Sequence, residues 1–233
     1  MGEKMKSDLL IIIPAYNEEE NIEKVVENLR INYGQYDYIV VNDGSRDSTA
    51  QICREKGFHL LDLPVNLGLA GAFQTGMKYA YEKGYAYAIQ FDADGQHLPE
   101  YLDAMLERIR QGYDIVIGSR FVRFKKSRSM RMIGSRMITV AIKVTTGERI
   151  ADPTSGMRMF SRDMIREFAM NLNYGPEPDT VSYLIKNGAK VSEVQVEMAE
   201  REFGSSYLNV IGSMKYMLKM LLSIILVQSF RKR

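Results

Sequence analysis

The stretch LLIIIPAYNEEENIEKVVENL at residues 9–29 contains the pattern that decides the fold. It begins with an unbroken apolar run, which is typical of a β-strand buried on both faces of a sheet. A polar turn comes next, and apolar residues then return at helical spacing, at Ile22, Val25, Val26 and Leu29. The stretch therefore predicts a strand, a turn and an amphipathic helix, in that order.

The same alternation continues through the first half of the chain. Further apolar runs, each interpreted as a buried strand, occur at 38–41, 58–63, 85–91 and 114–118. Two of the segments between them, 70–82 and 99–111, are long enough for helices. Parallel strands are joined by crossover connections that usually contain a helix. We therefore predict an α/β fold: a Rossmann-like, open, mainly parallel sheet with helices on both faces.

The second half of the chain is less regular. Helix-like segments occur at 130–146, from about Ser161, and at 179–187, with a Gly/Pro turn at 151–156 and a strand-like run at 191–198. From Val210 onward, apolar residues form one stripe of a helix, made of Met214, Met217, Leu218, Leu221, Leu222 and Ile225. We divide the chain into one domain at 1–208 and an amphipathic helix with a basic tail at 209–233.

The composition limits the classes to which the protein can belong. The 31 basic residues nearly balance the 29 acidic ones, so net charge gives no reason to expect a nucleic-acid partner. The single cysteine, Cys53, cannot form an intramolecular disulfide, which fits a reducing compartment. The first residues do not resemble a signal peptide, and the longest apolar stretch, 220–227, is shorter than the ~20 residues that span a bilayer. We expect a cytoplasmic protein.

Polar residues follow each of the five predicted strands. They lie at 14–18, 42–45, 66–68, 92–96 and 119–120. In open α/β sheets, ligands bind in the crevice beyond the carboxyl ends of the strands. One such segment alone, for example NDGS at 42–45, is equally well explained as a polar turn. Five together predict a ligand site at this edge of the sheet.

Asp92 and Asp94 are the members of this set with the clearest chemistry. Residues two apart on an extended backbone point to the same side, so two carboxylates can face one cation. Oxygen ligands of this kind favour Mg²⁺ or Mn²⁺, and such an ion usually keeps substrate phosphates among its ligands. Gln96 can add a carbonyl oxygen or position a phosphate. For the adjacent His97, we favour a supporting or packing role over metal ligation.

Six segments together resemble the ordered motifs of glycosyltransferase family 2. They are IIIPAYNEEENI at 11–22, VVNDGSRDST at 40–49, NLGLAGAFQTGM at 66–77, QFDADGQHLPE at 90–100, IGSRFV at 117–122 and ADPTSGMRMF at 151–160. The resemblance covers residues 8–206 and is strongest to the polyprenyl-phosphate sugar transferases, such as dolichol-phosphate mannose synthase and bacterial undecaprenyl-phosphate sugar transferases. It implies a GT-A fold, a nucleoside-diphosphate-sugar donor and inversion at the anomeric carbon.

The resemblance also implies roles for individual residues. The donor site would consist of Pro14, Ala15, Tyr16, Glu18 and Asp43 around the nucleoside, and of Asp92, Asp94 and Gln96 at the metal and diphosphate; we add Asn66 and Gly68, which follow the third strand. Arg120 and Arg131 match arginines that hold a lipid phosphate, and Arg201 matches an arginine in a loop that folds over the donor. The usual lysine near the end of that loop motif is absent, and Ser206 and Tyr207 stand in its place.

The charge of the segment 120–136 indicates the kind of acceptor. A phosphate monoester has a second pKa of about 6, so at neutral pH it is largely ionised and needs cations more than a base. The segment is rich in Lys and Arg and contains no acidic residue, and we assign Arg120 and Arg131 to the phosphate. A solvated or membrane-surface face fits three of the other cations: Lys125, Lys126 and Arg128.

Asp152, in the turn at 151–156, is the candidate base or acceptor-orienting carboxylate, although Asp before Pro is also a common turn former. The sequence thus predicts an inverting, metal-dependent transfer of a sugar to undecaprenyl phosphate or another polyprenyl phosphate, for cell-envelope glycan synthesis at the inner face of the membrane. The C-terminal helix is expected to meet the membrane surface or a small membrane protein, with a homo-oligomer contact or a core position as alternatives.

Three other functions compete with this interpretation. A family 2 transferase can use a glycan hydroxyl as its acceptor, which requires a base. A phosphatase of the haloacid dehalogenase type also has Asp-x-Asp after a strand, but after its first strand, whereas Asp92 follows the fourth predicted strand. A non-catalytic subunit is the third. The pattern leaves open which sugar is transferred, UDP against GDP, and Mg²⁺ against Mn²⁺.

Overall fold

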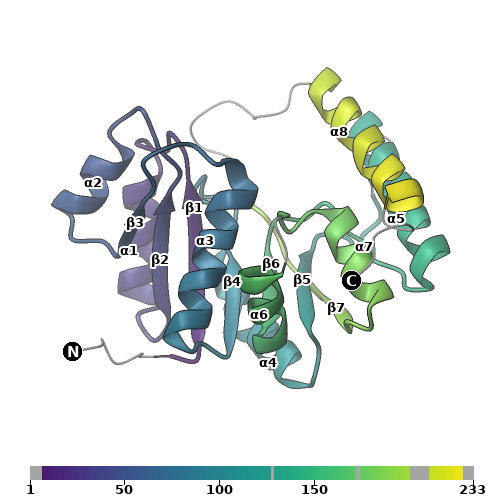
Figure 1. Cartoon of the computed structure of the whole chain (residues 1–233), viewed down its shortest axis with the longest axis horizontal. Coiled ribbons are helices and arrows are strands. Elements are labelled where there is room, and N and C mark those ends of the chain that lie inside the picture. The colour runs from purple at the N-terminus through teal and green to yellow at the C-terminus, as the bar shows by residue number, and fades with distance from the viewer. Residues whose placement is uncertain (1–6, 127–128, 172–173, 200–209, 228–233) are drawn as a thin grey trace.

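The computed structural model describes residues 7–126, 129–171, 174–199 and 210–227. Within these segments the strands form one sheet in the order β3-β2-β1-β4-β6-β5-β7, with helices on both faces (Figure 1). The strands are β1 (Leu9–Ala15), β2 (Asp37–Asn42), β3 (Leu60–Asp62), β4 (Tyr87–Gln90), β5 (Ile115–Ser119), β6 (Arg158–Ser161) and β7 (Val191–Gln195). The five strands that the apolar runs predict agree with β1 to β5 to within two residues at each end.

The helices alternate with the strands in the first half of the chain and cluster in the second. They are α1 (Ile22–Asn32), α2 (Thr49–Glu55), α3 (Gly68–Lys83), α4 (Leu102–Arg110), α5 (Met130–Thr146), α6 (Arg162–Met170), α7 (Pro178–Lys186) and α8 (Val210–Leu222), with a 3₁₀ turn at Pro99–Tyr101 and a π-helical turn at Ser223–Val227. The short helix α2 is not predicted by the sequence pattern, because only Thr49 and Cys53 in it are buried.

The sheet is mainly parallel, as predicted, and the exception is β6. Strands β1 to β4 run parallel, whereas β6 lies between β4 and β5 and is antiparallel to both. Because β5 therefore runs in the same direction as β4, the carboxyl ends of β1 to β5 all lie at one edge. This arrangement brings the polar segments after these five strands to the same side of the molecule.

Two apolar clusters form the core, one on each face of the sheet. On one face, Phe73 of α3 packs edge-on against Phe168 of α6 with 5.1 Å between ring centroids, and Phe160 of β6 lies against both rings. On the other face, Val26 of α1 and Met105 of α4 are completely buried against the sheet. The prediction of helices on both faces is therefore confirmed.

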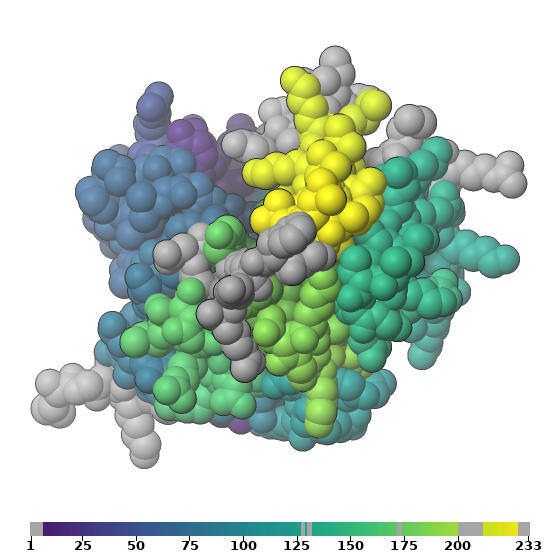
Figure 2. All heavy atoms as spheres, turned by 45° about the vertical axis from the view of Figure 1, so that its right-hand side comes forward, coloured from purple at the N-terminus to yellow at the C-terminus, as the bar shows by residue number. Residues whose placement is uncertain are grey.

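The C-terminal helix α8 packs along α5 on one side of the molecule (Figures 1 and 2). The two helices approach closely at Gly134, where an added Cβ would lie only 2.7 Å from a side-chain carbon of Met217. Two side chains also fasten this region to α7: the Tyr216 hydroxyl donates to Glu177, and Ser223 Oγ donates to Asp179 Oδ2 at 2.6 Å. The helix is thus attached to the body of the protein.

The predicted single stripe on α8 divides between two faces in the structure. Its members Met217 and Leu221 pack against the core, together with the buried Met220 and Ile224, which the predicted stripe does not include. Four members of the predicted stripe are exposed instead: Met214, Leu218, Leu222 and Ile225. Among the helices that the structure describes, none is long and apolar enough to cross a membrane. The predicted boundary between 208 and 209 and the basic tail at 231–233 lie outside the described residues.

Candidate active site

The site begins at the adjoining ends of β1 and β2. Ala15 and Asn42 are register partners at these ends, and the amide of Asp43 donates to the carbonyl of Ala15 at 2.8 Å. Pro14 precedes this contact in β1, and the ring of Tyr16 just beyond it is 38% exposed. An exposed aromatic ring at the end of a parallel strand can stack on a planar base.

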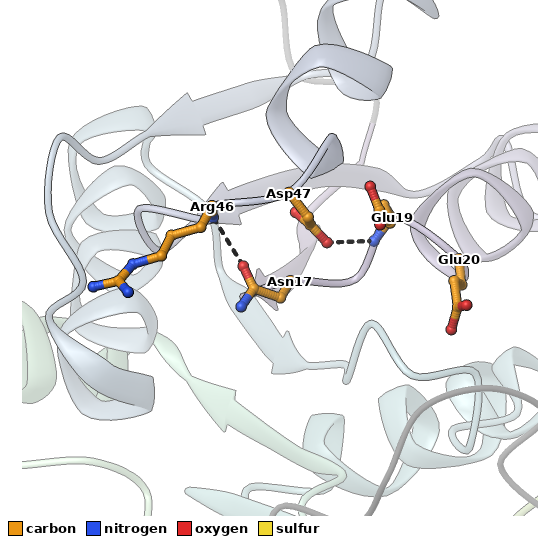
Figure 3. A pocket seen from close by; sticks show the side chains of 5 residues that line it. All are labelled: Asn17, Glu19, Glu20, Arg46 and Asp47. Carbon is orange, nitrogen blue, oxygen red and sulfur yellow. Dashed lines mark hydrogen bonds between the residues drawn. The ribbon is translucent and has the colours of Figure 1, made fainter.

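The loops after β1 and β2 are held together by reciprocal hydrogen bonds (Figure 3). The Arg46 amide donates to Asn17 Oδ1 at 2.8 Å, and the Glu19 amide donates to Asp47 Oδ2 at 3.1 Å. Asn17 has a positive φ of 55°, a conformation that few residues other than glycine and asparagine adopt readily. The Glu18 amide donates to Thr49 Oγ1 at 2.8 Å. This network fixes the backbone that carries Tyr16 and Glu18.

An open pocket of about 410 Å³ is lined by residues of both loops (Figure 3). Its walls are Asn17, Glu19, Glu20, Arg46 and Asp47. Three of these five side chains are acidic, so the pocket repels a diphosphate rather than attracting it. The pocket is therefore not where we place the donor's charged part.

The segment after β3 is fastened to the end of β2 through Asp43. Asp43 is 3% exposed, and its Oδ1 accepts the Leu67 amide at 2.7 Å. Burial raises the pKa of Asp43, while hydrogen bonds from the Leu67 and Gly68 amides act in the opposite direction. Asn66 Oδ1 accepts the Gly68 amide at 3.1 Å, and Gly68 has a φ of 75°. Asn66 and Gly68 thus shape this wall of the site.

Asp92 and Asp94 lie directly beyond β4, in a loop closed by their own hydrogen bonds. Asp94 is 6% exposed, and its Oδ1 accepts the Gln96 amide at 3.0 Å. The Asp92 carboxylate is about one-third exposed, and its Oδ1 accepts from Gln90 Nε2 at 3.0 Å. One carboxylate is therefore held inside the loop and the other faces outward.

His97 contacts both the backbone and the carboxylate of Asp92. Its Nδ1 accepts the Asp92 amide at 2.8 Å, so that nitrogen carries no proton, and its Nε2 lies 3.4 Å from Asp92 Oδ2. Gly156 approaches the same carboxylate: an added Cβ there would lie 2.8 Å from Asp92 Oδ2. The space beside Asp92 is therefore kept open by the absence of a side chain.

Asp92, Asp94 and Gln96 fit a divalent cation that takes its remaining ligands from water and from the phosphates of a substrate. Among the described residues, no group of three His, Cys, Asp or Glu side chains could hold a metal ion. Two carboxylates and an amide oxygen leave several ligand positions to be filled by water and phosphate oxygens, which is how Mg²⁺ commonly binds. Asp92, Asp94 and Gln96 would hold such an ion.

The loop with the two carboxylates is joined to the chain that leads into residues 200–209. The Ala199 amide donates to the Gln96 carbonyl at 3.0 Å, and His97 forms an antiparallel bridge with Met198. Arg201, Ser206 and Tyr207 themselves lie outside the described residues. The predicted role of Arg201 over the donor stays a prediction.

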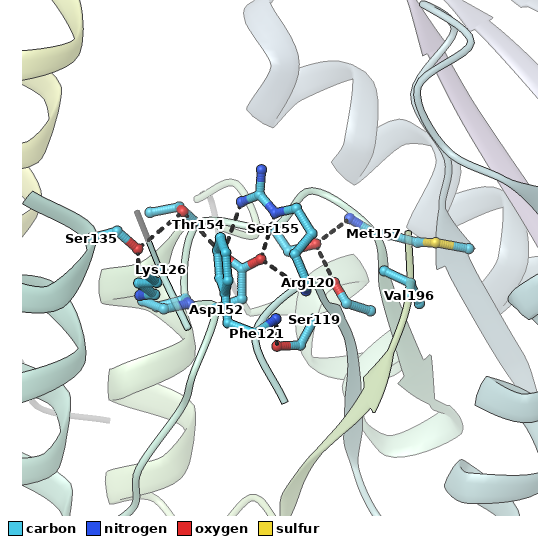
Figure 4. Close-up of polar contacts among 12 residues, drawn as sticks. Ser119, Arg120, Phe121, Lys126, Ser135, Asp152, Thr154, Ser155, Met157 and Val196 are labelled. Carbon is cyan, nitrogen blue, oxygen red and sulfur yellow. Dashed lines mark hydrogen bonds and ion pairs between the residues drawn. The ribbon is translucent and has the colours of Figure 1, made fainter. Parts of the chain in front are cut away.

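Arg120 and Asp152 meet at the end of β5 (Figure 4). Arg120 donates through Nε at 2.7 Å and through Nη2 at 3.0 Å to the two carboxylate oxygens, and its amide donates to Asp152 Oδ2 at 3.2 Å. Asp152 is completely buried, and the Arg120 side chain is 25% exposed. The backbone at Asp152 is in turn held by Glu193, whose carboxylate accepts the amides of Ala151 and Asp152.

Two further cations lie near this pair. Lys126, which the sequence analysis assigns to a solvated or membrane-surface face, is partly buried and donates to Ser135 Oγ at 2.7 Å and to Thr139 Oγ1 at 3.3 Å. Arg131 lies in the first turn of α5, but its side chain is outside what the structure describes. The structure therefore brings Arg120 and Lys126 to one place and leaves the role of Arg131 as a prediction.

Arg158 is a buried cation beside the turn 151–156 that the sequence analysis does not single out. It is 3% exposed at the start of β6, its Nη2 donates to the Pro153 carbonyl at 2.7 Å, and burial lowers its pKa. A second bond in the same region, from Ser155 Oγ to the Gly118 carbonyl at 2.5 Å, fixes the turn 151–156 to β5. The only sequence signal is a cation within the apolar run MRMF.

The comparison with known families decides the class of protein. A sequence model described as "Glycosyl transferase family 2" matches residues 10–168, which span β1 to α6 and contain both Asp92 and Asp152. The chain belongs to glycosyltransferase family 2. The transferase is therefore an enzyme, and the phosphatase and non-catalytic alternatives no longer apply.

Individual relatives indicate to which group within the family the transferase is related. The transferase is 31% identical over 210 residues to a polyprenol monophosphomannose synthase of Mycolicibacterium smegmatis, covering 84% of this chain and 79% of that protein. It is 31% identical over 213 residues to an undecaprenyl-phosphate mannosyltransferase of Micrococcus luteus, covering 85% and 86%. It is thus related to polyprenyl-phosphate sugar transferases.

Solved structures confirm the fold of the transferase. A glucosyl-3-phosphoglycerate synthase from Mycobacterium tuberculosis, in complex with Mn²⁺, UDP and phosphoglyceric acid, matches with a TM-score of 0.71 over 97% of this chain and 79% of that chain. At 18% sequence identity, this match supports the GT-A fold alone. The predicted fold class is confirmed.

Proposed function

We propose that this transferase moves a sugar from a nucleoside-diphosphate sugar, with a bound Mg²⁺ or Mn²⁺, to the phosphate of a polyprenyl phosphate. The observation that carries the proposal is that Asp152 is buried and bonded to Arg120, and so is not placed to act as a base. Its two carboxylate oxygens are both bonded to Arg120, and the residue has no exposed surface. A hydroxyl acceptor needs a base, whereas an ionised phosphate needs only positive charge. The acceptor side of this site offers charge.

The chain's own residues can perform the transfer without moving a proton. In the proposed step, an oxygen of the acceptor phosphate attacks the anomeric carbon, and the bond from that carbon to the nucleoside diphosphate breaks. The leaving diphosphate takes the electron pair, and a metal ion held at Asp92 and Asp94 would stabilise its charge. Tyr16 and Asp43 would hold the nucleoside, and Arg120 would orient the acceptor phosphate.

The exposed faces of α5 and α8 support an encounter with membrane-embedded acceptors. Adjacent apolar side chains are exposed on both helices: Ile133, Met137, Val140 and Val144 on α5, and Met214, Leu218 and Leu222 on α8. Neither helix contains an acidic residue, and the exposed cations on them are Arg136, Lys143, Lys215 and Lys219. An apolar face flanked by cations is what binds an anionic lipid surface. We place the transferase peripherally on the inner membrane face.

The test is an acceptor screen with the purified chain. The protein is incubated with Mg²⁺ or Mn²⁺, a panel of UDP- and GDP-sugars, and either undecaprenyl phosphate or soluble glycans. A chloroform-soluble, sugar-labelled product that forms only with undecaprenyl phosphate is expected. A product that forms only with soluble glycans would overturn the proposal in favour of a hydroxyl acceptor.

A further inference from the structure

Lys126 lies in the segment between β5 and α5, and its ammonium group turns inward. Its Nζ donates to the hydroxyl of Ser135 (Figure 4). It also donates to the hydroxyl of Thr139, one helical turn further along α5. It also lies 5.5 Å from the centroid of the Phe121 ring, and the guanidinium of Arg120 lies 5.2 Å from the same ring. The two cations therefore contact one aromatic side chain.

A line of hydrogen bonds connects Lys126 with the ion pair at Arg120. Ser135 Oγ receives the Lys126 bond and lies 3.5 Å from Thr154 Oγ1. Thr154 Oγ1 in turn donates to Asp152 Oδ1 at 3.3 Å. Lys126 is thus part of the same hydrogen-bonded cluster as Arg120, from its own loop, and Asp152, from the turn before β6.

The two carboxylates of this hydrogen-bonded cluster have close partners, but the Lys126 ammonium is not bonded to either of them. Asp152 is bonded to Arg120, and the Glu193 carboxylate accepts two backbone amides. The hydrogen bonds that the Lys126 ammonium donates to other described residues go to neutral hydroxyls. Burial lowers the pKa of Lys126 to about 8, more than the attraction of Asp152 and Glu193 raises it. Removing an ammonium from water without a carboxylate partner costs free energy, which an arriving anion would offset.

We propose that Lys126 binds the phosphate of the acceptor, with Arg120 on the other side of the same anion. The inference rests on the proposed function, because it needs a phosphate-bearing acceptor. Lys126 would then determine acceptor specificity: a phosphate monoester supplies the anion that no carboxylate among the described residues provides by a direct hydrogen bond, and a neutral hydroxyl compound does not. The exposed neighbour Lys125 has no such role.

The first experiment compares Lys126→Met with the matched control Lys125→Met, using farnesyl phosphate as a short-chain acceptor. A hydrogen bond between charged partners accounts for about 10- to 100-fold in affinity. We expect Lys126→Met to raise KM for farnesyl phosphate by that factor, while KM for the sugar nucleotide changes by less than about twofold. Lys125→Met should leave both values unchanged, and Lys126→Arg should recover most of the affinity. An unchanged acceptor KM in Lys126→Met would overturn the proposal.

A second measurement does not depend on turnover. The rate at which acetic anhydride modifies Lys126 is followed by mass spectrometry, with Lys125 as the internal reference. Farnesyl phosphate should slow the modification of Lys126 at least about fivefold, and farnesol should not. Equal rates with and without farnesyl phosphate would contradict binding at Lys126. If the wild-type chain glycosylates only hydroxyl acceptors, the proposed function fails, and this protection measurement alone decides whether Lys126 binds a phosphate.

Discussion

The guanidinium of Arg120 bonds both carboxylate oxygens of Asp152, at 2.7 and 3.0 Å, and Asp152 is buried completely beneath it. Two-point pairing of this kind fixes the plane and position of an arginine. The sequence leaves two roles open for Asp152, a base or a carboxylate that orients the acceptor site. The geometry favours the second role, in which Asp152 acts by holding Arg120.

The substitution Asp152→Asn separates these two roles. Loss of a general base lowers kcat by about 10²- to 10⁴-fold. For a carboxylate that positions Arg120, we expect a rise in acceptor KM and less than about a tenfold fall in kcat. Removal of one partner from a largely buried pair should also lower the free energy of unfolding by about 2 kcal/mol. Kinetics with saturating polyprenyl phosphate, together with urea unfolding, check both effects, and the exposed Asp163→Asn serves as control.

Asp94→Asn is expected to remove metal binding without opening the loop. The asparagine oxygen can still accept the Gln96 amide, which Asp94 Oδ1 accepts at 3.0 Å, but the charge is lost. Loss of a charged ligand should weaken Mn²⁺ binding by about 100-fold or more and abolish most turnover. Titration of Mn²⁺ by electron paramagnetic resonance, with a nucleoside diphosphate present, measures the affinity. Wild-type Mn²⁺ affinity in this variant would place the ion elsewhere.

Gly156→Ala tests the space beside Asp92. The added Cβ would lie 2.8 Å from Asp92 Oδ2, so the carboxylate must move. We expect about a tenfold loss of Mn²⁺ affinity with a small change in melting temperature, since residues that orient a metal ligand contribute on this scale. Gly118→Ala is the matched control, because its Cβ would meet Val196 and Met157 instead. Equal metal affinities in the two variants would show that the crowding at Asp92 is harmless.

The sheet and most of the site residues could be predicted from the sequence, because buried parallel strands leave long apolar runs with polar residues at their carboxyl ends. Strand β6 could not. It has four residues and contains Arg158, so it carries no apolar alternation, and its antiparallel position depends on packing between β4 and β5. Helix α2 shows the same limit, since only two of its seven residues are buried.

The partners of charged residues were also beyond the reach of the sequence. Arg120 and Asp152 are separated by 32 residues, and nothing in either motif indicates that they bond each other. In the sequence Lys126 lies in a run of cations, and only the fold shows that its ammonium turns toward Ser135. Periodicity predicts which face of an element is buried, but it does not predict which charges meet.

Glutamate substitutions on the exposed apolar face of α5 and α8 test whether this face contacts the membrane. Met137 and Leu218 are 50% and 58% exposed, so the double substitution Met137→Glu/Leu218→Glu should leave the fold intact. Glutamate adds charge that anionic lipids repel and removes apolar area, so binding to vesicles with anionic phospholipids should fall at least about tenfold. Co-sedimentation measures it, and Ile31→Glu, at an exposed position on α1, is the control. Undiminished vesicle binding would exclude this face as the membrane contact.

The pH dependence of acceptor binding should follow the protonation of Lys126. Burial depresses the pKa of Lys126 to about 8; Arg120 and Arg136 lower it further, and Asp152 and Glu193 partly oppose the shift. Lys126 is therefore mostly charged below pH 8, and it loses its proton and its charge as the pH rises through that value. A phosphate monoester becomes a dianion above about pH 6, so affinity for farnesyl phosphate should be highest between about pH 6 and 8.

Above pH 8 the affinity of the wild-type chain should fall by up to about tenfold for each pH unit, until it reaches the lower affinity of the chain with a neutral Lys126. Lys126→Arg keeps its charge in this range, because an arginine in a protein does not lose its proton there. Its acceptor affinity should therefore stay nearly constant between pH 8 and 9.5 in equilibrium binding with labelled farnesyl phosphate. A parallel decline in the wild-type chain and in Lys126→Arg would assign the titration to another group.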